Sequence, residues 1–251
     1  MKLNMKKIAG AAADVLYPRA CPVCGDILPK EAAGRDDPYI CPECLEELDF
    51  LTGQCRCMRC SHPAYDGEEY CEDCREKERA FDAGFALLAH DERAKRIIYD
   101  LKFKTVKDNA DVLAFELVRK AGKTAELWHA EALIPVPLHK KRLRTRGFNQ
   151  AQLIAEKISG YANAAGLVIP PCDGTYLQRS RATAPQRNTE QRQRGANIEN
   201  AFSVNIKDKP YGSVILVDDI FTTGSTLNEC AKTLKQTGTS VVYFLTASIV
   251  C

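Results

Sequence analysis

The chain has 251 residues, of which 45% are hydrophobic and 27% charged, and its formal net charge is +2. This composition is typical of a soluble globular protein with one large domain or two smaller ones, and so small a net charge does not point to a polyanionic partner for the chain as a whole. No apolar run approaches the roughly 18–20 residues that a membrane-spanning helix needs.

The N-terminal residues 1–13 superficially resemble a secretory signal, because Lys2, Lys6 and Lys7 precede or flank a short alanine-rich stretch. The apolar part is short, however, and Asp14 interrupts it. A secretory signal has a longer apolar region and a small-residue cleavage site. We therefore expect an N-terminal helix with an apolar patch, and a cytoplasmic protein without a membrane span.

Cysteine pairs dominate the next part of the chain, where nine of the 12 cysteines lie between Cys21 and Cys74. Eight of them form four Cys-x-x-Cys pairs. One such turn presents two thiolates to a tetrahedral metal, so two turns complete a closed structural zinc site. The pairs therefore predict about two zinc ions per chain, with the ligands Cys21, Cys24, Cys41, Cys44, Cys57, Cys60, Cys71 and Cys74.

The spacing leaves alternatives open. Consecutive and crossed pairing of the four turns are equally compatible with zinc chemistry, and Cys55 could replace Cys57 as a ligand. Disulfides would require an oxidising compartment, for which the chain shows no export signal. Redox chemistry is disfavoured because four copies of the motif lie in a segment with few large aliphatic residues.

The composition changes near residue 78, and we expect a domain boundary there. Residues 1–78 are rich in Cys, Pro, Gly and charge, and a segment of this kind cannot build a core without a staple such as zinc. Residues 79–251 alternate apolar runs with helical periods. The sequence therefore predicts a small zinc-knuckle domain over 1–78 and a larger domain over 79–251.

The larger domain reads as alternating strands and helices. In one helix, Ala94, Ile97, Ile98 and Leu101 recur at the spacing of a single helical face. Proline or glycine ends several elements, at Pro137 and near Gly160 and Gly238. We expect strands at 85–90, 132–136, 167–169, 214–217 and 241–246, and helices at 91–102, 108–120, 150–159 and from about 225 to 237.

Continuous apolar strands that alternate with helices are typical of an α/β fold whose parallel sheet is covered by helices on both faces. In the last helix, Leu227, Cys230, Ala231 and Leu234 fall on one face and are expected to pack on that sheet.

The most specific motif is the string 214–227, in which a buried strand leads into two acidic residues and a run of small ones. Open α/β sheets bind ligands at the carboxyl ends of their strands, where Asp218 and Asp219 can accept hydrogen bonds from a vicinal diol. The run that follows opens a helix, and its free N–H groups, hydroxyls and positive dipole form a phosphate cradle. The residues of this cradle are Thr222, Thr223, Gly224, Ser225 and Thr226.

A helix N-cap beside two solvated aspartates would explain the small residues taken alone. The complete string after a buried strand favours the ribose 5-phosphate site instead, and the absence of a Gly-Lys-Ser/Thr sequence excludes a Walker A loop.

Two basic segments lie elsewhere in the chain. Residues 135–150 hold five lysines and arginines and no acidic residue, and residues 178–197 hold five arginines against Glu190. Clustered basic side chains stabilise pyrophosphate or hold a nucleic-acid backbone. Solvated loops are the alternative, and a lone His139 indicates nothing by itself.

The string 214–227 resembles the signature of type I phosphoribosyltransferases. The resemblance implies a type I phosphoribosyltransferase-like parallel sheet, ribose contacts at Asp218 and Asp219, and 5-phosphate contacts at Thr222–Thr226. It also implies Mg²⁺ carried with the pyrophosphate of the ligand phosphoribosyl pyrophosphate, or with a related phosphoribosyl compound.

Together with residues 16–25, 101–103, 135–137, 146–150 and 181–186, this string makes the chain similar to the ComF family of competence-associated proteins. The resemblance implies zinc in the cysteine segment and a link to DNA uptake, with single-stranded DNA and proteins of the competence machinery as partners. It implies pyrophosphate contacts at Leu138, His139, Lys140 and Lys141, and a mobile loop from residue 179 to 194 that carries Arg179, Arg181 and Arg194.

Three functions fit these features. The first is a phosphoribosyltransferase, in which a nucleophile attacks C1 of the sugar and displaces pyrophosphate, although no residues that would read a particular acceptor are evident. The second is a module that handles single-stranded DNA, for which Phe103 and Phe148 lie beside basic residues. The third is a regulator that keeps the ligand site without catalysis.

Overall fold

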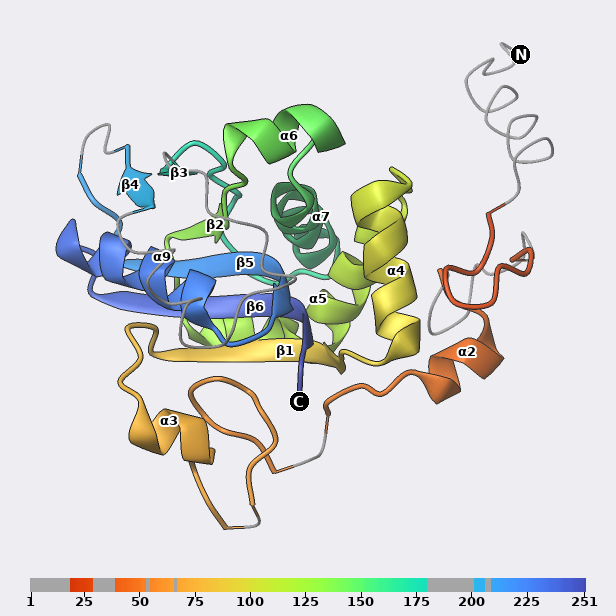
Figure 1. The fold of residues 1–251 in the computed structure, drawn as a ribbon, viewed down its shortest axis with the longest axis horizontal. Helices are drawn as coiled ribbons and strands as arrows, with labels where there is room; N and C mark the ends of the chain where they lie inside the picture. Colours follow the sequence, from red (N-terminus) through yellow and green to blue (C-terminus); the bar gives the residue numbers. More distant parts are fainter. Residues whose placement is uncertain (1–18, 29–38, 53–54, 66, 180–200, 206–208) are drawn as a thin grey trace. The chain divides into compact units, whose positions relative to one another are not determined.

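The computed structural model describes residues 19–28, 39–52, 55–65, 67–179, 201–205 and 209–251 (Figure 1). The chain divides into two compact units, Met1–Leu48 and Asp49–Cys251, each of which is described by itself. The N-terminal helix expected over residues 1–13 lies outside the described residues. No helix in the described parts of the chain combines the length and apolar character required to cross a membrane.

The first unit contains the helix α2 (Pro42–Glu47) and a tight turn closed by an antiparallel bridge between Ala20 and Ile27. Gly25 lies in this turn with φ of 92°, a left-handed conformation that glycine adopts without strain. Among the described residues of the unit few side chains are buried, and thiols are among them, which agrees with a segment that needs a staple. They are Cys21, Val23, Leu28, Ile40, Cys44 and Leu48.

The second unit is built on a parallel sheet of four strands in the order β1-β6-β5-β2 (Figure 1). All four residues from Val214 to Val217 are buried in the sheet, as expected for a strand covered on both faces. The parallel α/β fold predicted from the alternating pattern is therefore confirmed. The strands are β1 (Ala83–Ala89), β2 (Ala132–Pro135), β5 (Ser213–Phe221) and β6 (Val241–Ile249).

Helices flank this sheet, and a separate antiparallel pair, β3 (Leu177–Arg179) and β4 (Phe202–Val204), lies beside α9. In the order β1-β6-β5-β2, the strand that follows β1 in the chain, β2, lies on one side of it, whereas the strand that follows β5, β6, lies on the opposite side of β5. Because crossovers between parallel strands are right-handed, the helices after β1 and the helix after β5 cover opposite faces of the sheet. The helices are α4 (Glu92–Phe103), α5 (Asn109–Leu127), α6 (Lys140–Arg146), α7 (Gln150–Ala164) and α9 (Ser225–Gln236).

Several expected elements differ from the structure. The helix expected at 108–120 continues to Leu127, and the strand expected at 241–246 continues to Ile249. The strand expected at 167–169 is absent: Pro170 and Pro171 lack the N–H groups of a ladder, and only Cys172 forms a bridge, with Leu133. The helix expected to end near Gly160 continues to Ala164, because burial of Ile158 and Ala162 outweighs the roughly 1 kcal/mol cost of an internal glycine. β5 extends four residues beyond Val217, to Phe221, so the acidic pair lies within the strand.

The second cysteine cluster belongs to the same compact unit as the sheet. Cys57, Cys60, Cys71 and Cys74 are buried in one hydrophobic core with Phe81 and Phe244, whose rings meet edge to face at 5.1 Å. The segment before this cluster also pairs with the edge strand β1, because the N–H of Leu51 donates to the carbonyl of Leu87 at 3.0 Å. The compact unit thus begins at Asp49, and the domain boundary expected near residue 78 stays a prediction.

Candidate functional site

The acidic pair Asp218 and Asp219 lies in the last part of β5, at the carboxyl edge of the parallel sheet. An ammonium from α4 fixes one carboxylate: Lys102 Nζ lies 2.8 Å from Asp219 Oδ1, and both side chains are about 15% exposed. The N–H of Asp219 donates to Asp218 Oδ1 at 2.9 Å. The two carboxylates are therefore held in different ways, one by a cation and one by the backbone.

The environment of Asp218 raises the pKa of its carboxyl group, so that this group is partly protonated near neutral pH. Burial raises the pKa of Asp218 to about 7, and the negative charge of Asp219 adds to this effect. The backbone N–H of Asp219 and the charges of Lys102 and Arg179 act in the opposite direction. A positive ligand group or a metal ion beside the pair would favour the ionised form.

The predicted phosphate loop leaves β5 at Phe221 and enters α9 at Ser225. Gly224 is the N-cap of this helix, with φ of 71°. A β-carbon at this position would lie 2.4 Å from Cζ of the buried Phe221 ring. Only glycine satisfies both conditions, so Gly224 allows the sharp turn between the strand and the helix.

Backbone donors of this loop remain available to a ligand. Within the described residues, the N–H groups of Thr222, Thr223 and Gly224 have no hydrogen-bond acceptor. The hydroxyls of Thr223 and Ser225 contact each other at 2.7 Å. α9 adds the positive end of its dipole, and α9 is 12 residues long. The arrangement therefore offers several donors to an anion next to two carboxylates.

The segment Leu138, His139, Lys140 and Lys141 lies just beyond β2, which pairs with β5 in parallel. The carboxyl ends of neighbouring parallel strands meet at one edge of a sheet, so this segment shares the edge of Asp218. His139 is the N-cap of α6, and its Nδ1 accepts from the N–H of Lys141 at 3.2 Å. The predicted role of His139 and its neighbours with pyrophosphate stays a prediction.

The predicted mobile loop is described only at its beginning. Arg179 ends β3, its guanidinium stacks on Phe202 at 5.2 Å, and its charge lowers the pKa of Asp218. Arg181 and Arg194 lie outside the described residues.

Lys102 binds Asp219 directly but belongs to none of the motifs that point to the site. Only the family resemblance includes its segment, residues 101–103. Arg146 stacks on the ring of Phe103 at 5.2 Å, and Phe103 contacts Tyr99 at 4.8 Å between ring centroids. Tyr99 and Phe103 are each about half exposed. A signal existed for these aromatic residues, because two large exposed rings at i and i+4 on an otherwise amphipathic helix are unusual.

Two sets of four cysteines form candidate metal centres, and both join consecutive pairs. Within each set, all sulfur atoms lie within 4.8 Å of one another. Cys55 stands outside both sets, so the structure favours Cys57 as the ligand. The two sets are Cys21, Cys24, Cys41 and Cys44 in the first unit, and Cys57, Cys60, Cys71 and Cys74 in the second.

The turns around these cysteines fit zinc thiolates. The carbonyls of Cys21 and Cys57 accept from the N–H of the residue four positions later, Gly25 and Ser61, each at 2.9 Å. Both of those residues have positive φ. Backbone N–H groups also point at sulfur, as in His62 to Cys60 Sγ at 3.4 Å. Such bonds stabilise thiolate charge around a tetrahedral ion.

We expect about two zinc ions per chain, because each set supplies the four thiolates of a closed site. Elemental analysis of protein purified without chelator checks this number. A protein free of metal under these conditions, with its thiols intact, would contradict the assignment of the clusters.

The structure defines the class of the protein: an α/β protein with a parallel sheet, flanking helices and two tetracysteine sites. The profile of the double zinc ribbon domain matches residues 12–75. This match agrees with the two cysteine sets and supports structural zinc in both.

Most of the chain is similar to proteins of known name, of which three are compared with it. Competence protein F of Haemophilus influenzae is 31% identical over 204 residues, which are 79% of this chain and 85% of that protein. DNA utilization protein YhgH of Escherichia coli K12 is 30% identical over 206 residues (81% and 87%). Competence protein ComFC of Bacillus subtilis is 25% identical over 215 residues (81% of each). The chain therefore belongs to the ComF family of competence proteins.

Solved structures give a more distant likeness. A hypoxanthine phosphoribosyltransferase of Staphylococcus aureus is 13% identical, with a TM-score of 0.34 over 56% of this chain and 62% of that one. A hypoxanthine-guanine phosphoribosyltransferase of Schistosoma mansoni in complex with IMP is 12% identical, with a TM-score of 0.30 over 57% and 64%. The chain thus spans less than two thirds of these structures, and scores at this level support no further conclusion.

Proposed function

We propose that this protein binds phosphoribosyl pyrophosphate, together with Mg²⁺, at the carboxyl edge of β5. One observation carries the proposal: the carboxylates of Asp218 and Asp219 lie directly before a loop in which the N–H groups of Thr222, Thr223 and Gly224 have no acceptor among the described residues. A diol acceptor next to an anion cradle is the chemical complement of a ribose 5-phosphate.

In this proposal each part of the site binds one part of the ligand. The acidic pair accepts hydrogen bonds from the two ribose hydroxyls, and residues Thr222–Thr226 hold the 5-phosphate. The segment from Leu138 to Lys141 and the arginines of the loop over 179–194 would balance the pyrophosphate charge, and Mg²⁺ carried with the ligand would neutralise part of it. The expected cytoplasmic location belongs to the same proposal, because thiolate zinc sites persist in a reducing compartment.

Transfer of the phosphoribosyl group is a further step within the proposal. An acceptor nucleophile would form a bond to C1 while the bond from C1 to pyrophosphate breaks. The protein would supply orientation and charge stabilisation, without a covalent nucleophile of its own. A regulator that binds the same ligand without turnover uses the same contacts, and measuring pyrophosphate release in the presence of nucleobases distinguishes the two.

The test is a calorimetric titration with phosphoribosyl pyrophosphate and Mg²⁺ at several pH values, compared with ribose 5-phosphate and with pyrophosphate. We expect the complete ligand to bind most tightly. Affinity should rise as pH increases through about 7 and then level off, because ionised Asp218 accepts a hydrogen bond from a ribose hydroxyl more strongly than the protonated acid does. Equal affinity for pyrophosphate alone would show that the ribose is not recognised and would overturn the proposal.

A second candidate function is the handling of single-stranded DNA, as the names of the competence and DNA utilization relatives suggest. The specific observation that favours it is the group Tyr99, Phe103 and Arg146, which presents two half-exposed rings and a stacked guanidinium. Unpaired bases stack on such rings, and cations hold the phosphates between them. Partners from the competence machinery would then act on the same DNA.

Replacing Arg144 and Arg146 by alanine tests this second candidate. If each arginine neutralises one phosphate, the slope of log affinity against log salt should decrease by about 1.4 in total, at about 0.7 per phosphate for single strands. Fluorescence anisotropy with a labelled oligonucleotide across a salt series measures the slope. The double variant Lys123→Ala, Lys232→Ala, which removes two exposed charges on other helices, should leave the slope nearly unchanged. Equal effects of the two double variants would contradict a localised DNA site.

A further inference from the structure

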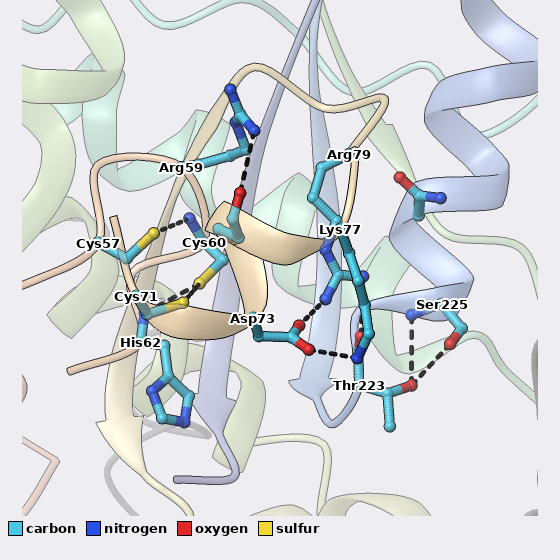
Figure 2. A network of polar contacts seen from close by, with 12 residues as sticks. Cys57, Arg59, Cys60, His62, Cys71, Asp73, Lys77, Arg79, Thr223 and Ser225 are labelled. Atoms are coloured by element: carbon cyan, nitrogen blue, oxygen red, sulfur yellow. Dashed lines mark hydrogen bonds and ion pairs between the residues drawn. The ribbon is translucent and has the colours of Figure 1, made fainter. Parts of the chain in front are cut away.

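Arg79 connects the second cysteine cluster to the predicted phosphate loop (Figure 2). It follows the cluster by five residues, and its side chain is only 7% exposed. One end of the guanidinium pairs with Asp73 inside the cluster, and Arg79 Nη1 donates to the backbone carbonyl of Thr223 at 3.1 Å. A single buried side chain therefore spans from the metal-binding segment to the loop over 222–226.

The metal-binding turn fixes the position of Asp73. Asp73 lies between Cys71 and Cys74 in the short helix α3 (Glu72–Glu76). The carbonyl of Cys71 accepts from the N–H of Cys74 at 3.0 Å, which closes the turn. Two of the four thiols of the candidate zinc site thus flank the carboxylate that holds Arg79.

A second tie joins the same segment to the start of α9. The N–H of Ala80 donates to Asn228 Oδ1 at 2.7 Å, and the N–H of Asn228 donates to the carbonyl of Gly224 at 2.8 Å. Residues 79 and 80 therefore act on the carbonyls of Thr223 and Gly224, one directly and one through Asn228. These two carbonyls belong to the residues that form the turn of the loop.

The orientation of the Thr223 carbonyl has a consequence for the ligand side of the loop. In a trans peptide the C=O and the following N–H point in opposite directions. Because Arg79 holds the Thr223 oxygen, the N–H of Gly224 points away from Arg79. This N–H has no acceptor among the described residues, so it is free for a phosphate oxygen.

The cluster and the loop also line one partly open space. A cavity of about 1140 Å³ lies between them, and Cys60, Cys71, Asp73, Arg79, Thr223 and Ser225 are among its lining residues. The cysteines of the cluster also share a hydrophobic core with Phe221, where the loop begins. Among the described residues, the polar links from the cluster's segment to the loop and to α9 are those of Arg79 to Thr223 and of Ala80 to Asn228.

We propose that Arg79 is a positioning residue, through which the second zinc site sets the conformation of the loop over 222–226 and thus its affinity for the 5-phosphate. This inference rests on the proposed function for its ligand, but the link itself is a property of the ligand-free protein. Zinc at the second site then acts on ligand binding through Asp73 and Arg79, in addition to folding its own segment.

The test compares Arg79→Met with Lys77→Met. Lys77 pairs with the same Asp73 carboxylate but is about 60% exposed, and within the described residues it has no hydrogen bond or ion pair with the loop, so it is a matched control. The first measurement is NMR of the ligand-free protein, which reads the carbonyl signal of Thr223 and the amide signal of Gly224. The second is calorimetry with phosphoribosyl pyrophosphate, and elemental analysis verifies that the zinc content is unchanged.

We expect Arg79→Met to shift both NMR signals and to weaken binding by about 10-fold, the effect of losing one well-placed hydrogen bond to an anion. Lys77→Met should change neither. The milder variant Asp73→Asn should shift the same signals in the same direction, and the Asp73→Asn, Arg79→Met double variant should add little to Arg79→Met alone. Arg79→Lys, which keeps a cation, should restore part of the affinity.

Unchanged signals of Thr223 and Gly224 in Arg79→Met, or equal changes in Lys77→Met, would overturn the inference. If the wild-type protein fails to bind phosphoribosyl pyrophosphate while the signals shift as expected, the link stands and the proposed function fails. The two results are therefore distinguishable.

Discussion

The Asp218→Asn, Asp219→Asn double variant should lose at least about 100-fold in affinity for phosphoribosyl pyrophosphate. Each carboxylate is proposed to accept a hydrogen bond from a ribose hydroxyl, and a hydrogen bond to a charged group contributes about 1.5–3 kcal/mol. Two such bonds correspond to a loss of two to four orders of magnitude, at about 1.4 kcal/mol per tenfold change. Titration calorimetry at pH 8, where Asp218 is ionised, measures the loss.

A matched control separates loss of the ligand contact from loss of structure. Asp111 also lies in a partly buried ion pair, with Lys157 at 2.8 Å, but on α5 and outside the proposed site. Asp111→Asn should therefore bind with wild-type affinity. Unchanged affinity of the Asp218→Asn, Asp219→Asn variant would refute the assignment of the acidic pair.

The raised pKa of Asp218 also predicts how replacing this side chain changes the stability of the protein at different pH values. The pKa is raised in the folded protein, to about 7, above the value of about 3.9 in an unfolded chain. Between these values the folded state binds more protons, so the contribution of Asp218 to stability falls as pH rises from about 4 to about 7. The melting temperature of Asp218→Asn minus that of wild type should therefore be higher at pH 8 than at pH 4. Thermal unfolding of both proteins at both pH values measures this difference.

Much of the fold could be predicted because the strands carry an unambiguous signal. The run Val214–Val217 is completely buried, and the face formed by Leu227, Cys230, Ala231 and Leu234 packs as its spacing indicates. Strand and helix ends were less predictable, since they depend on packing: β5 continues to Phe221 because the Phe221 ring stacks on Phe244 at 5.4 Å. A contact between rings on two different strands cannot be read from the local sequence pattern.

Prediction of the candidate site from the sequence is limited in the same way, to features that lie close together in the chain. The acidic pair and Gly224 are readable from one continuous string, because strand, turn and helix follow one another there. Lys102 lies 117 residues from Asp219, and Arg79 lies 144 residues from Thr223. Contacts of this separation arise from the arrangement of elements in space, so a single sequence contains no local signal for them.

Loss of the second zinc site should destabilise the sheet far more than loss of the first. Cys57, Cys60, Cys71 and Cys74 are each less than 10% exposed and share a core with Phe81 and Phe244. Without zinc, this core would contain unpaired thiols, and the segment over residues 55–76 would no longer be cross-linked by the metal. A structural zinc site contributes several kcal/mol to folding, so this loss is large. In a unit of this size about 1 kcal/mol shifts the melting temperature by 2–4 °C. We expect Cys71→Ser, Cys74→Ser to lower the melting temperature of the sheet by more than about 10 °C.

The matched comparison is Cys41→Ser, Cys44→Ser in the first cluster. Those thiols belong to the compact unit Met1–Leu48, and Cys24 of the same cluster is exposed. This variant should lose one zinc ion, as shown by elemental analysis, yet leave the melting of the sheet within a few degrees of wild type. Circular dichroism detects the sheet transition in both variants. Equal losses of stability would mean that both clusters support the sheet, and the asymmetry derived from the burial of the second cluster would be wrong.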